Sequence, residues 1–449
     1  MPVSASLRPV HAVWDAAVAV TPMPLPVGPR IGVIYPSGAG NLGDEAILKA
    51  TFDALRARWP NASLHAFTLH PARTAANHGV HAEALTGVHR RLFGAPWPDG
   101  PLPIRAALSL ARRTRRIPLL GVLTKWTADW AGTVFFEAVS LKRSWKWLQT
   151  ADLVLAAGGG QLDAVWGGTW GQPYALARWA WLARRARVPF AFLSVGYGGA
   201  KTRMSRWLLR YAVSNATYCS VRDEGSRALT EQLGVRNKLP IVPDLAFGLT
   251  AGPPLRKTRP GYDVGVSPMT YLRPGCWPSE NPAEYQKYVS LWADVVRERV
   301  SKGDRVHLFV SDPGDTDAVR DVWNRLDDRT RGGCSIAQTT TPEMLLDLFR
   351  RLDVVVSSRL HGVLLAIVAI RPVLALSHER KVRAVMTDAG VAPFCLDLPS
   401  ATLKEVSDRI ASLTNEPEES VRRLRDYVAQ SRASLRQQDE LLPQLLRVR

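Results

Sequence analysis

The sequence predicts an α/β protein built on two parallel sheets, and three observations predict it. From residue 31 onward, short apolar runs that end in Gly or Ser alternate with helical stretches, as in a parallel sheet. Two such series follow one another, and the segment 250–254 between them contains one Gly and two Pro, which break both helix and strand. The length of 449 residues also exceeds one ordinary core, so we expect two domains.

The elements follow in order along the chain. Residues 1–30 are rich in Pro, Ala and Val without a period, which predicts a loose N-terminal arm. The first domain is expected over 31–250, with strands at 31–35, 63–67, 153–157, 190–195 and 218–221. The second is expected over 251–400, with strands at 263–267, 306–310, 354–357 and 373–376. Residues 401–449 predict a closing arm of two polar helices that are separated near 415–417.

Composition narrows the class of partner. Hydrophobic residues make up 46% of the chain and charged residues 22%, which is typical of a globular protein. The 58 Lys and Arg against 40 Asp and Glu give a formal charge of +18, so the surface should attract anions. No run of basic residues interleaved with aromatics has the spacing of a known nucleic-acid module. We therefore expect phosphate-bearing substrates and no nucleic acid.

Cysteine spacing and the N-terminus indicate the compartment. The four cysteines are far apart and form no CxxC pair, which argues against a zinc knuckle or a disulfide framework and favours a reducing compartment. The chain starts without a basic leader, and no stretch reaches about 18 uninterrupted apolar residues. The prediction is a cytoplasmic protein without a membrane span.

A basic insert at about 85–130 stands apart from this pattern. Its part 104–125 mixes leucines with five arginines. One interpretation is an amphipathic patch that makes peripheral contact with an anionic membrane at its inner face. The alternative is the solvated basic face of an ordinary connection.

The first candidate constellation is the glycine-rich stretch 37–45, between a predicted strand and a predicted helix. Its glycines let a ligand approach the backbone, and Asn41 and Gly43 are candidate substrate contacts. The carboxylates of Asp44 and Glu45 at the helix start would repel a phosphate, so the loop is better suited to hydroxyl groups. Asp44 is a candidate base or ligand for a sugar hydroxyl, or a structural helix cap. The stretch matches neither the dinucleotide-binding nor the Walker motif.

Two further strand ends carry candidate binding residues. Gly159 and Gly160 follow the strand 153–157, where ligands of open parallel sheets bind, although a turn with unusual φ would also need glycine. Arg222 ends the strand 218–221 and could offer paired N–H donors to a carboxylate or phosphate. Its alternative role is a salt bridge to Asp223 or Glu224.

The strongest constellation is the sequence VVSSRLHGVLLA at 355–366. A β-branched strand runs into a helix start that carries Arg359 and His361, and Lys381 comes soon after the next strand. Cations and an acid on neighbouring strand ends predict an anion pocket with a proton donor.

Together these motifs resemble the polysaccharide pyruvyl transferase family. The resemblance covers roughly residues 31–390 and is carried by GNLGDEAIL at 40–48, AAGGGQLD at 156–163, SVRDEGS at 220–226, VPDLAF at 242–247 and SSRLHGVLLA at 357–366, with Lys381 after them. It implies two Rossmann-like domains that face a central cleft, as in B-type glycosyltransferases. It also implies phosphoenolpyruvate as co-substrate, held by Arg222, Arg359 and Lys381, with His361 as the catalytic acid.

The resemblance implies transfer of the pyruvyl group to a sugar of a surface polysaccharide or of its lipid-linked precursor. Protonation of the donor's methylene carbon makes C2 electrophilic, two hydroxyls add there, and phosphate leaves, so one acid and one base suffice. We expect Asp44 to act on the acceptor hydroxyls and no cofactor or metal to take part. Two rival hypotheses are a nucleotide-sugar-dependent glycosyltransferase and an inactive protein that binds anionic glycans.

Overall fold

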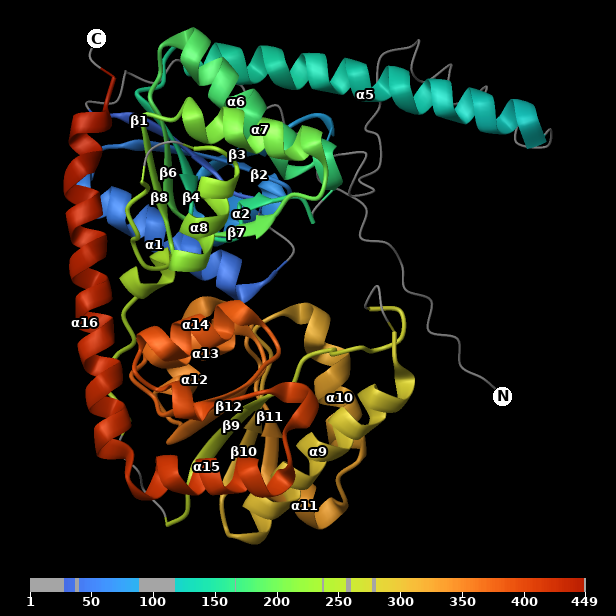
Figure 1. The fold of residues 1–449 in the computed structure, drawn as a ribbon, viewed down its shortest axis with the longest axis vertical. Helices are drawn as coiled ribbons and strands as arrows, with labels where there is room; N and C mark the ends of the chain where they lie inside the picture. The colour runs from blue at the N-terminus through green and yellow to red at the C-terminus, as the bar shows by residue number, and fades with distance from the viewer. Residues whose placement is uncertain are drawn as a thin grey trace.

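The computed structural model describes residues 28–36, 40–88, 118–165, 167–235, 238–255, 260–276 and 280–447, with side chains omitted for 118–129. Nearly all of the predicted N-terminal arm and the Arg-rich part of the predicted insert lie outside these ranges. Two six-stranded sheets, each parallel throughout, lie one above the other in Figure 1. The predicted α/β fold class with two such units is confirmed.

The first sheet has the strand order β3-β2-β1-β4-β6-β8, with a two-stranded sheet β5-β7 beside it. Its strands are β1 Arg30–Ile34, β2 Ser63–Thr68, β3 His81–Ala84, β4 Leu153–Ala157, β5 Leu162–Asp163, β6 Phe190–Val195, β7 Tyr197–Gly199 and β8 Tyr218–Val221. The helical segments are α1 Leu42–Arg58, α2 Pro71–His78, α5 Pro118–Leu148, η2 Gly168–Trp170, α6 Gln172–Ala186, α7 Arg203–Ser214, α8 Glu224–Gln232 and η3 Leu245–Gly248.

The second sheet has the order β11-β10-β9-β12-β13-β14. Its strands are β9 Asp263–Ser267, β10 Arg305–Leu308, β11 Cys334–Ile336, β12 Val354–Ser357, β13 Val373–Leu376 and β14 Cys395–Leu396. The helical segments are α9 Pro282–Ser301, η4 Pro313–Asp315, α10 Thr316–Asn324, α11 Asp328–Gly332, α12 Pro342–Phe349, α13 Leu360–Val368, α14 Arg380–Asp388, η5 Ala392–Phe394 and η6 Leu398–Ser400. The chain passes between the sheets after η3, where the sequence predicts a linker.

The C-terminal helices join the two halves of the molecule. They are α15 Leu403–Asn415 and α16 Pro417–Leu441, followed by η7 Leu442–Leu445, and they divide where the sequence predicts. Figure 1 shows α16 running along the side of both sheets. It buries Leu424, Val428 and Leu435, and Arg432 donates hydrogen bonds to the carbonyls of Phe247 and Leu249. The C-terminal arm, which the sequence predicts as two polar helices, therefore packs against both domains and connects them.

The domains also meet directly at the start of α1. The backbone N–H of Leu42 donates to the carbonyl of Ser311 at 2.9 Å, and Asn41 Nδ2 donates to Asp312 Oδ2 at 2.8 Å. One apolar core continues across this contact, from Ile47 and Phe52 of α1 to Phe349 and Val363 in the second unit. Burial of this shared core holds the two carboxyl edges of the sheets against each other.

Two further observations concern the cysteines and the length of the helices. All four cysteines, Cys219, Cys276, Cys334 and Cys395, are free thiols. In the parts of the chain that the structure describes, no helix has the length and apolar character needed to cross a bilayer.

Candidate active site

The centre of the site is a contact between α13 and α1. His361 lies in the first turn of α13, which follows β12 directly and is almost wholly apolar, so it is anchored in the core. Gly43 lies in the first turn of α1 and packs against the imidazole: a β-carbon there would lie 1.9 Å from His361 Nδ1. Only glycine permits this approach. Gly43 of the first domain and His361 of the second are therefore in contact, as expected if both predicted segments face one cleft.

The imidazole of His361 is buried, and charged side chains near it influence its pKa. The pKa of His361 is lowered to about 4, chiefly by burial; Arg222 and Lys381 contribute to the decrease, while Asp244 and Glu379 oppose it. Its Nε2 atom is buried and has no hydrogen-bond partner among the described residues. A buried polar atom without a partner is costly, and it indicates a place where a ligand group is accepted.

Arg222 lies at the end of β8 and engages two carboxylates. Its Nε lies 3.2 Å from Asp223 Oδ2, and its Nη1 lies 3.4 Å from Asp244 Oδ2. The salt bridge that the sequence left as an alternative is thus present. The guanidinium also passes beside Gly196, where a β-carbon would lie 2.7 Å from Nε, and it faces His361 closely enough to lower the pKa of that imidazole. Its role in donor binding stays a prediction.

Arg359 and Lys381 differ in how strongly neighbouring carboxylates bind them. Arg359 donates Nε and Nη2 to the two oxygens of Asp315, at 2.6 and 2.8 Å, and Asp315 is buried. This bidentate pair leaves the outer N–H groups for a ligand. Lys381 is 46% exposed, and its Nζ lies 3.3 Å from Glu379. It lowers the pKa of His361, and across the cleft also that of Asp163, a carboxyl whose pKa burial raises.

The loop at the start of α1 holds the other predicted residues. Asn41 caps the helix by accepting from the N–H groups of Gly43 and Asp44, while its amide reaches Asp312, so it bridges the domains. Asp44 accepts a hydrogen bond from the Tyr35 hydroxyl at 2.9 Å. Burial raises the pKa of Asp44 to about 7, opposed by the Tyr35 hydrogen bond and assisted by Asp312. Asp44 is therefore not the helix cap, and it titrates near neutrality.

The two predicted glycines have different surroundings. Gly159 has φ +64, and a β-carbon there would lie 2.1 Å from the Tyr35 hydroxyl oxygen, so the turn and the close packing both require glycine. Gly160 is exposed, with open space beside it. It is accessible to a ligand, but no contact of the described residues assigns it a role.

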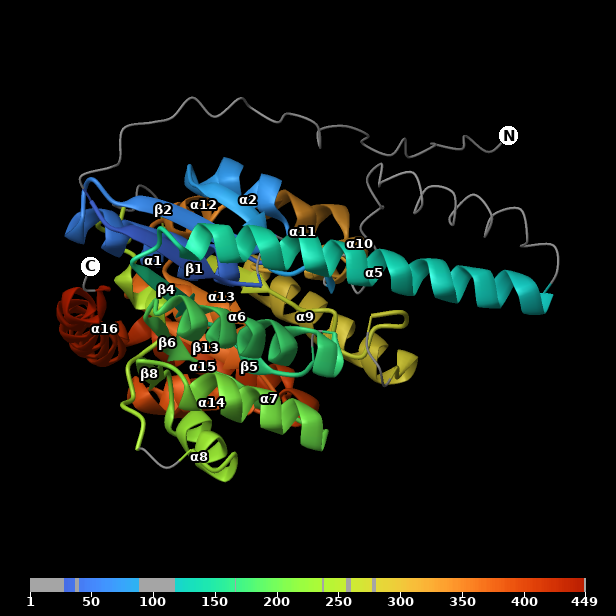
Figure 2. The ribbon, with the colours of Figure 1, turned by 90° about the horizontal axis from the view of Figure 1, so that it is seen from above.

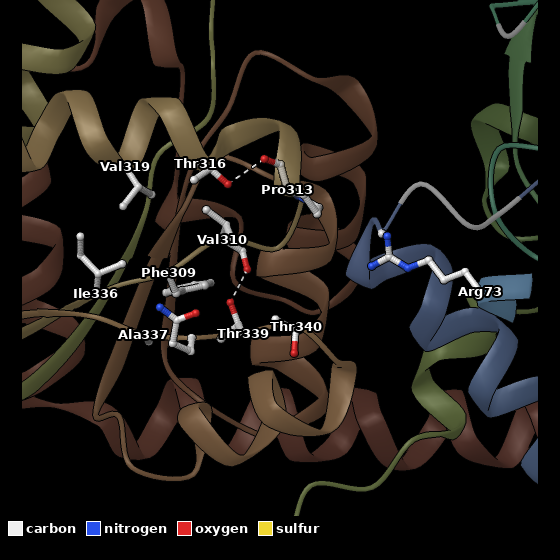
Figure 3. A pocket seen from close by; sticks show the side chains of 12 residues that line it. Arg73, Phe309, Val310, Pro313, Thr316, Val319, Ile336, Ala337, Thr339 and Thr340 are labelled. Atoms are coloured by element: carbon white, nitrogen blue, oxygen red, sulfur yellow. Dashed lines mark hydrogen bonds between the residues drawn. The ribbon is translucent and has the colours of Figure 1, made fainter. Parts of the chain in front are cut away.

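A cavity of about 230 Å³ adjoins the domain contact. It lies between Gly40 and Arg73 of the first unit and the ends of β10, β11 and α10 of the second (Figure 3). The hydroxyls of Thr316 and Thr339 line it, although each already donates to a backbone carbonyl. The Arg73 guanidinium lies against Gly40, 2.7 Å from where a β-carbon would be. Its lining combines apolar side chains with a few polar groups and contains no carboxylate, which suits a neutral or anionic ligand.

One group of side chains outside the cleft could hold a metal ion. His65 Nε2 lies 3.3 Å from His81 Nδ1 and 3.7 Å from a Glu83 oxygen, on the neighbouring strands β2 and β3. No sequence pattern indicates this cluster, because the two histidines are brought together only by strand register. It lies on the outer strands of the first sheet and supplies nothing to the chemistry at His361.

Four residues around the site carry no role in the sequence analysis. Tyr35, Asp244, Asp312 and Asp315 each contact a predicted site residue. Asp244 belongs to the VPDLAF motif and follows an isolated bridge between Val221 and Ile241, so this motif is the signal that could have identified it. The others were not signalled, since each follows a strand without a distinctive motif.

Solved structures define the class of the fold. UDP-GlcNAc 2-epimerase from Methanocaldococcus jannaschii is similar at a TM-score of 0.53 and 9% identity, covering 86% of this chain and 93% of that one. Anabaena HepE in complex with UDP gives 0.52 and 13%, covering 93% and 100%. The glycotransferase of kitacinnamycin gives 0.52 and 11%, covering 94% and 100%. The chain has the fold of B-type glycosyltransferases and related epimerases.

Comparison of the sequence with family models assigns the chain to one family within this fold class. A model of the family described as polysaccharide pyruvyl transferase matches residues 41–380, which is most of the chain. The chain belongs to the polysaccharide pyruvyl transferase family. No curated protein matches the sequence significantly.

Proposed function

We propose that the chain transfers the pyruvyl group of phosphoenolpyruvate to a sugar of a surface polysaccharide or of its lipid-linked precursor. The observation that carries this proposal is the Nε2 of His361, which has no hydrogen-bond partner among the described residues and lies within electrostatic reach of Arg222 of one domain and Lys381 of the other. Two cations near a proton-transfer group suit a small anion with a carboxylate and a phosphate.

In the proposed reaction, His361 gives a proton to the methylene carbon of the donor. One acceptor hydroxyl then adds to C2, and the bond between C2 and the phosphate oxygen breaks. A second hydroxyl adds to C2 and closes the ketal. One hydroxyl proton replaces the proton that His361 gave, and the other leaves with phosphate, so the sum is balanced without a redox partner.

The charge state of His361 is coupled to donor binding in this mechanism. In the empty site its pKa of about 4 makes the imidazole neutral at neutral pH. The negative charges of phosphoenolpyruvate beside it favour the protonated form and raise that pKa. The acid is thereby formed by binding of its own substrate.

Asp44 is assigned to the acceptor. It lies one residue after Gly43, which contacts His361, and it is oriented by Tyr35. The cavity that adjoins the domain contact is where we place further sugar units of the acceptor, because its lining joins apolar side chains to threonine hydroxyls and contains no carboxylate.

The decisive experiment is incubation of the protein with each donor and an oligosaccharide acceptor. Acceptor-dependent release of inorganic phosphate from phosphoenolpyruvate supports the proposal, and the product should gain the pyruvyl mass. The rival function, a nucleotide-sugar-dependent glycosyltransferase, draws on fold neighbours such as HepE that were solved with UDP. Release of a nucleoside diphosphate in place of phosphate would establish that rival.

Asp44 predicts a pH dependence. Because its pKa is raised to about 7 and its base form acts, kcat/KM for the acceptor should rise with pH and level off above about 7.5. At pH 6 the value should be about tenfold below this plateau. Asp44→Asn should lower kcat/KM by about 10²-fold or more and lose this rise. Asp53→Asn, on the exposed side of the same helix, is the control; an unchanged rise in Asp44→Asn would contradict the assignment.

Gly43 predicts a steric effect. The added β-carbon of Gly43→Ala would overlap the imidazole, so either His361 or α1 must move. A displacement of about 1 Å at a catalytic group lowers turnover by about 10²-fold. Steady-state phosphate release measures this. Gly332→Ala, which meets nothing within 4 Å, should have wild-type turnover. Wild-type turnover in Gly43→Ala would show that the His361 position is not critical.

A further inference from the structure

Helices α5, α6 and α7 form one layer over a face of the first sheet (Figures 1 and 2). Their inner sides enter one apolar core through Trp147, Trp179 and Leu209. Hydrogen bonds join α6 and α7 at both ends, from Thr169 to Thr202 near their starts and from Arg184 to Asn215 near their ends. The two helices therefore run parallel and present a common outer face, to which η2 adds at the end near the cleft.

Large apolar side chains are concentrated on this outer layer. Every tryptophan that is exposed in the described part of the chain belongs to α5, η2, α6 or α7: Trp130, Trp145, Trp170, Trp181 and Trp207. On α7, Trp207 is 59% exposed and Met204 is 53% exposed. Tryptophan favours a boundary between water and an apolar phase, because its ring is apolar and its N–H is polar.

The charge of the same face is of one sign. Helices α6 and α7 contain no Asp or Glu, and they expose Arg184, Arg185, Arg203, Arg206 and Arg210. The adjoining end of α5 exposes Lys142, Arg143 and Lys146. None of these cations forms an ion pair with a described residue, whereas some exposed cations of the second unit, such as Lys287 and Lys404, do. The first layer thus retains an unneutralised positive charge.

We propose that the outer face of α5, α6, η2 and α7 is a peripheral docking surface for an anionic lipid bilayer. Basic side chains attract the anionic headgroups, and the tryptophans and Met204 enter the interface between headgroups and acyl chains. This surface is separate from the basic insert in which the sequence predicts membrane contact. It stands on the described residues alone and does not depend on the reaction proposed at His361.

The proposed docking surface lies at the same edge of the first sheet as the cleft. Trp170 and the start of α7 lie beyond the carboxyl ends of β4 and β6, the same edge of the sheet at which Gly159 and Arg222 lie. A bilayer docked on this face would therefore lie beside the cleft. That arrangement suits an acceptor whose sugar is linked to a membrane lipid.

Vesicle flotation tests the proposal with the full chain. Wild-type protein should float with phosphatidylglycerol-containing vesicles, float much less with phosphatidylcholine alone, and detach as salt is raised, because screening weakens exposed charges. Each basic residue near an anionic surface contributes a factor of about five, so Arg203→Glu with Arg206→Glu should weaken partitioning at least about 25-fold. Trp181→Ala with Trp207→Ala should weaken it as well and reduce the blue shift of tryptophan fluorescence.

The matched control is Lys287→Glu with Lys404→Glu, which removes the same charge from exposed positions of the second unit. It should float like wild type. Thermal melts confirm that each variant is folded. Equal flotation of wild type and the Arg203, Arg206 variant would overturn the proposal. The proposal would also be overturned if the wild type does not bind vesicles and instead binds RNA through these residues, so that the same substitutions abolish RNA binding. The same holds if the wild type does not bind vesicles and forms a dimer that these substitutions abolish. Phosphate release in solution is measured separately and decides the reaction alone.

Discussion

Replacement of His361 by Ala is expected to lower kcat for phosphate release by about 10³-fold, within the range that a general acid contributes. The affinity for phosphoenolpyruvate should change little, because Arg222, Arg359 and Lys381 remain. The residue lies in the first turn of a buried helix with Nε2 unpartnered, so its removal deletes no hydrogen bond of the described structure. Steady-state phosphate release gives kcat, and calorimetry gives the Kd for the donor.

Proton uptake provides a second readout of the same residue. The pKa of His361 is about 4 in the empty site and should rise when the anionic donor binds. Binding at pH 6.5 should therefore take up a proton in the wild type and not in His361→Asn, as measured in buffers of different ionisation enthalpy. His70→Ala, an exposed histidine without a side-chain cap bond, is the control. Wild-type turnover in His361→Ala would exclude the catalytic assignment.

Sequence patterns predicted the interior strands of both sheets and the edge strand β8, but missed the edge strands β3, β11 and β14. Central strands such as β4 and β12 are continuous apolar runs because both of their faces are buried. The edge strands β3, β11 and β14 are short, and β3 has the sequence HAEA with no buried residue. These edge strands are paired on one side and partly solvated, so their residues give little apolar signal. The edge strand β8 was predicted because three of its four residues are buried.

At the site, too, sequence patterns identified residues with local signals and missed partners that are distant in the sequence. Gly43, Asp44, Arg359 and His361 were identified because strand ends and helix starts concentrate ligand contacts, which is a local rule. Their partners come from elsewhere in the chain: Asp315 pairs with Arg359, and Asp312 pairs with Asn41 from the other domain. Local patterns could not show that Asn41 bridges the domains, since that contact depends on how the two sheets dock.

The pair of Arg359 and Asp315 predicts the largest effect on stability. Arg359→Ala would leave the carboxylate of Asp315, which is 1% exposed, with the N–H and hydroxyl of Thr270 as its only donors among the described residues. Breaking a buried pair by removing one partner costs about 3–5 kcal/mol, because the remaining charge is uncompensated. Urea unfolding should therefore show a free energy of unfolding lower by about this amount. Arg320→Ala, which breaks the exposed pair with Asp317, should stay within about 1 kcal/mol of wild type.

A second substitution separates stability from donor binding at this position. In Arg359→Ala with Asp315→Asn, the buried charge is gone, so much of the lost stability should return. If Arg359 also holds the donor through its outer N–H groups, this stable double variant should still bind phosphoenolpyruvate at least about tenfold more weakly than Asp315→Asn alone. Equal donor affinity in the two variants would make Arg359 a structural residue and leave Arg222 and Lys381 as the donor clamps. Unchanged stability in Arg359→Ala would instead show that Asp315 is satisfied without it.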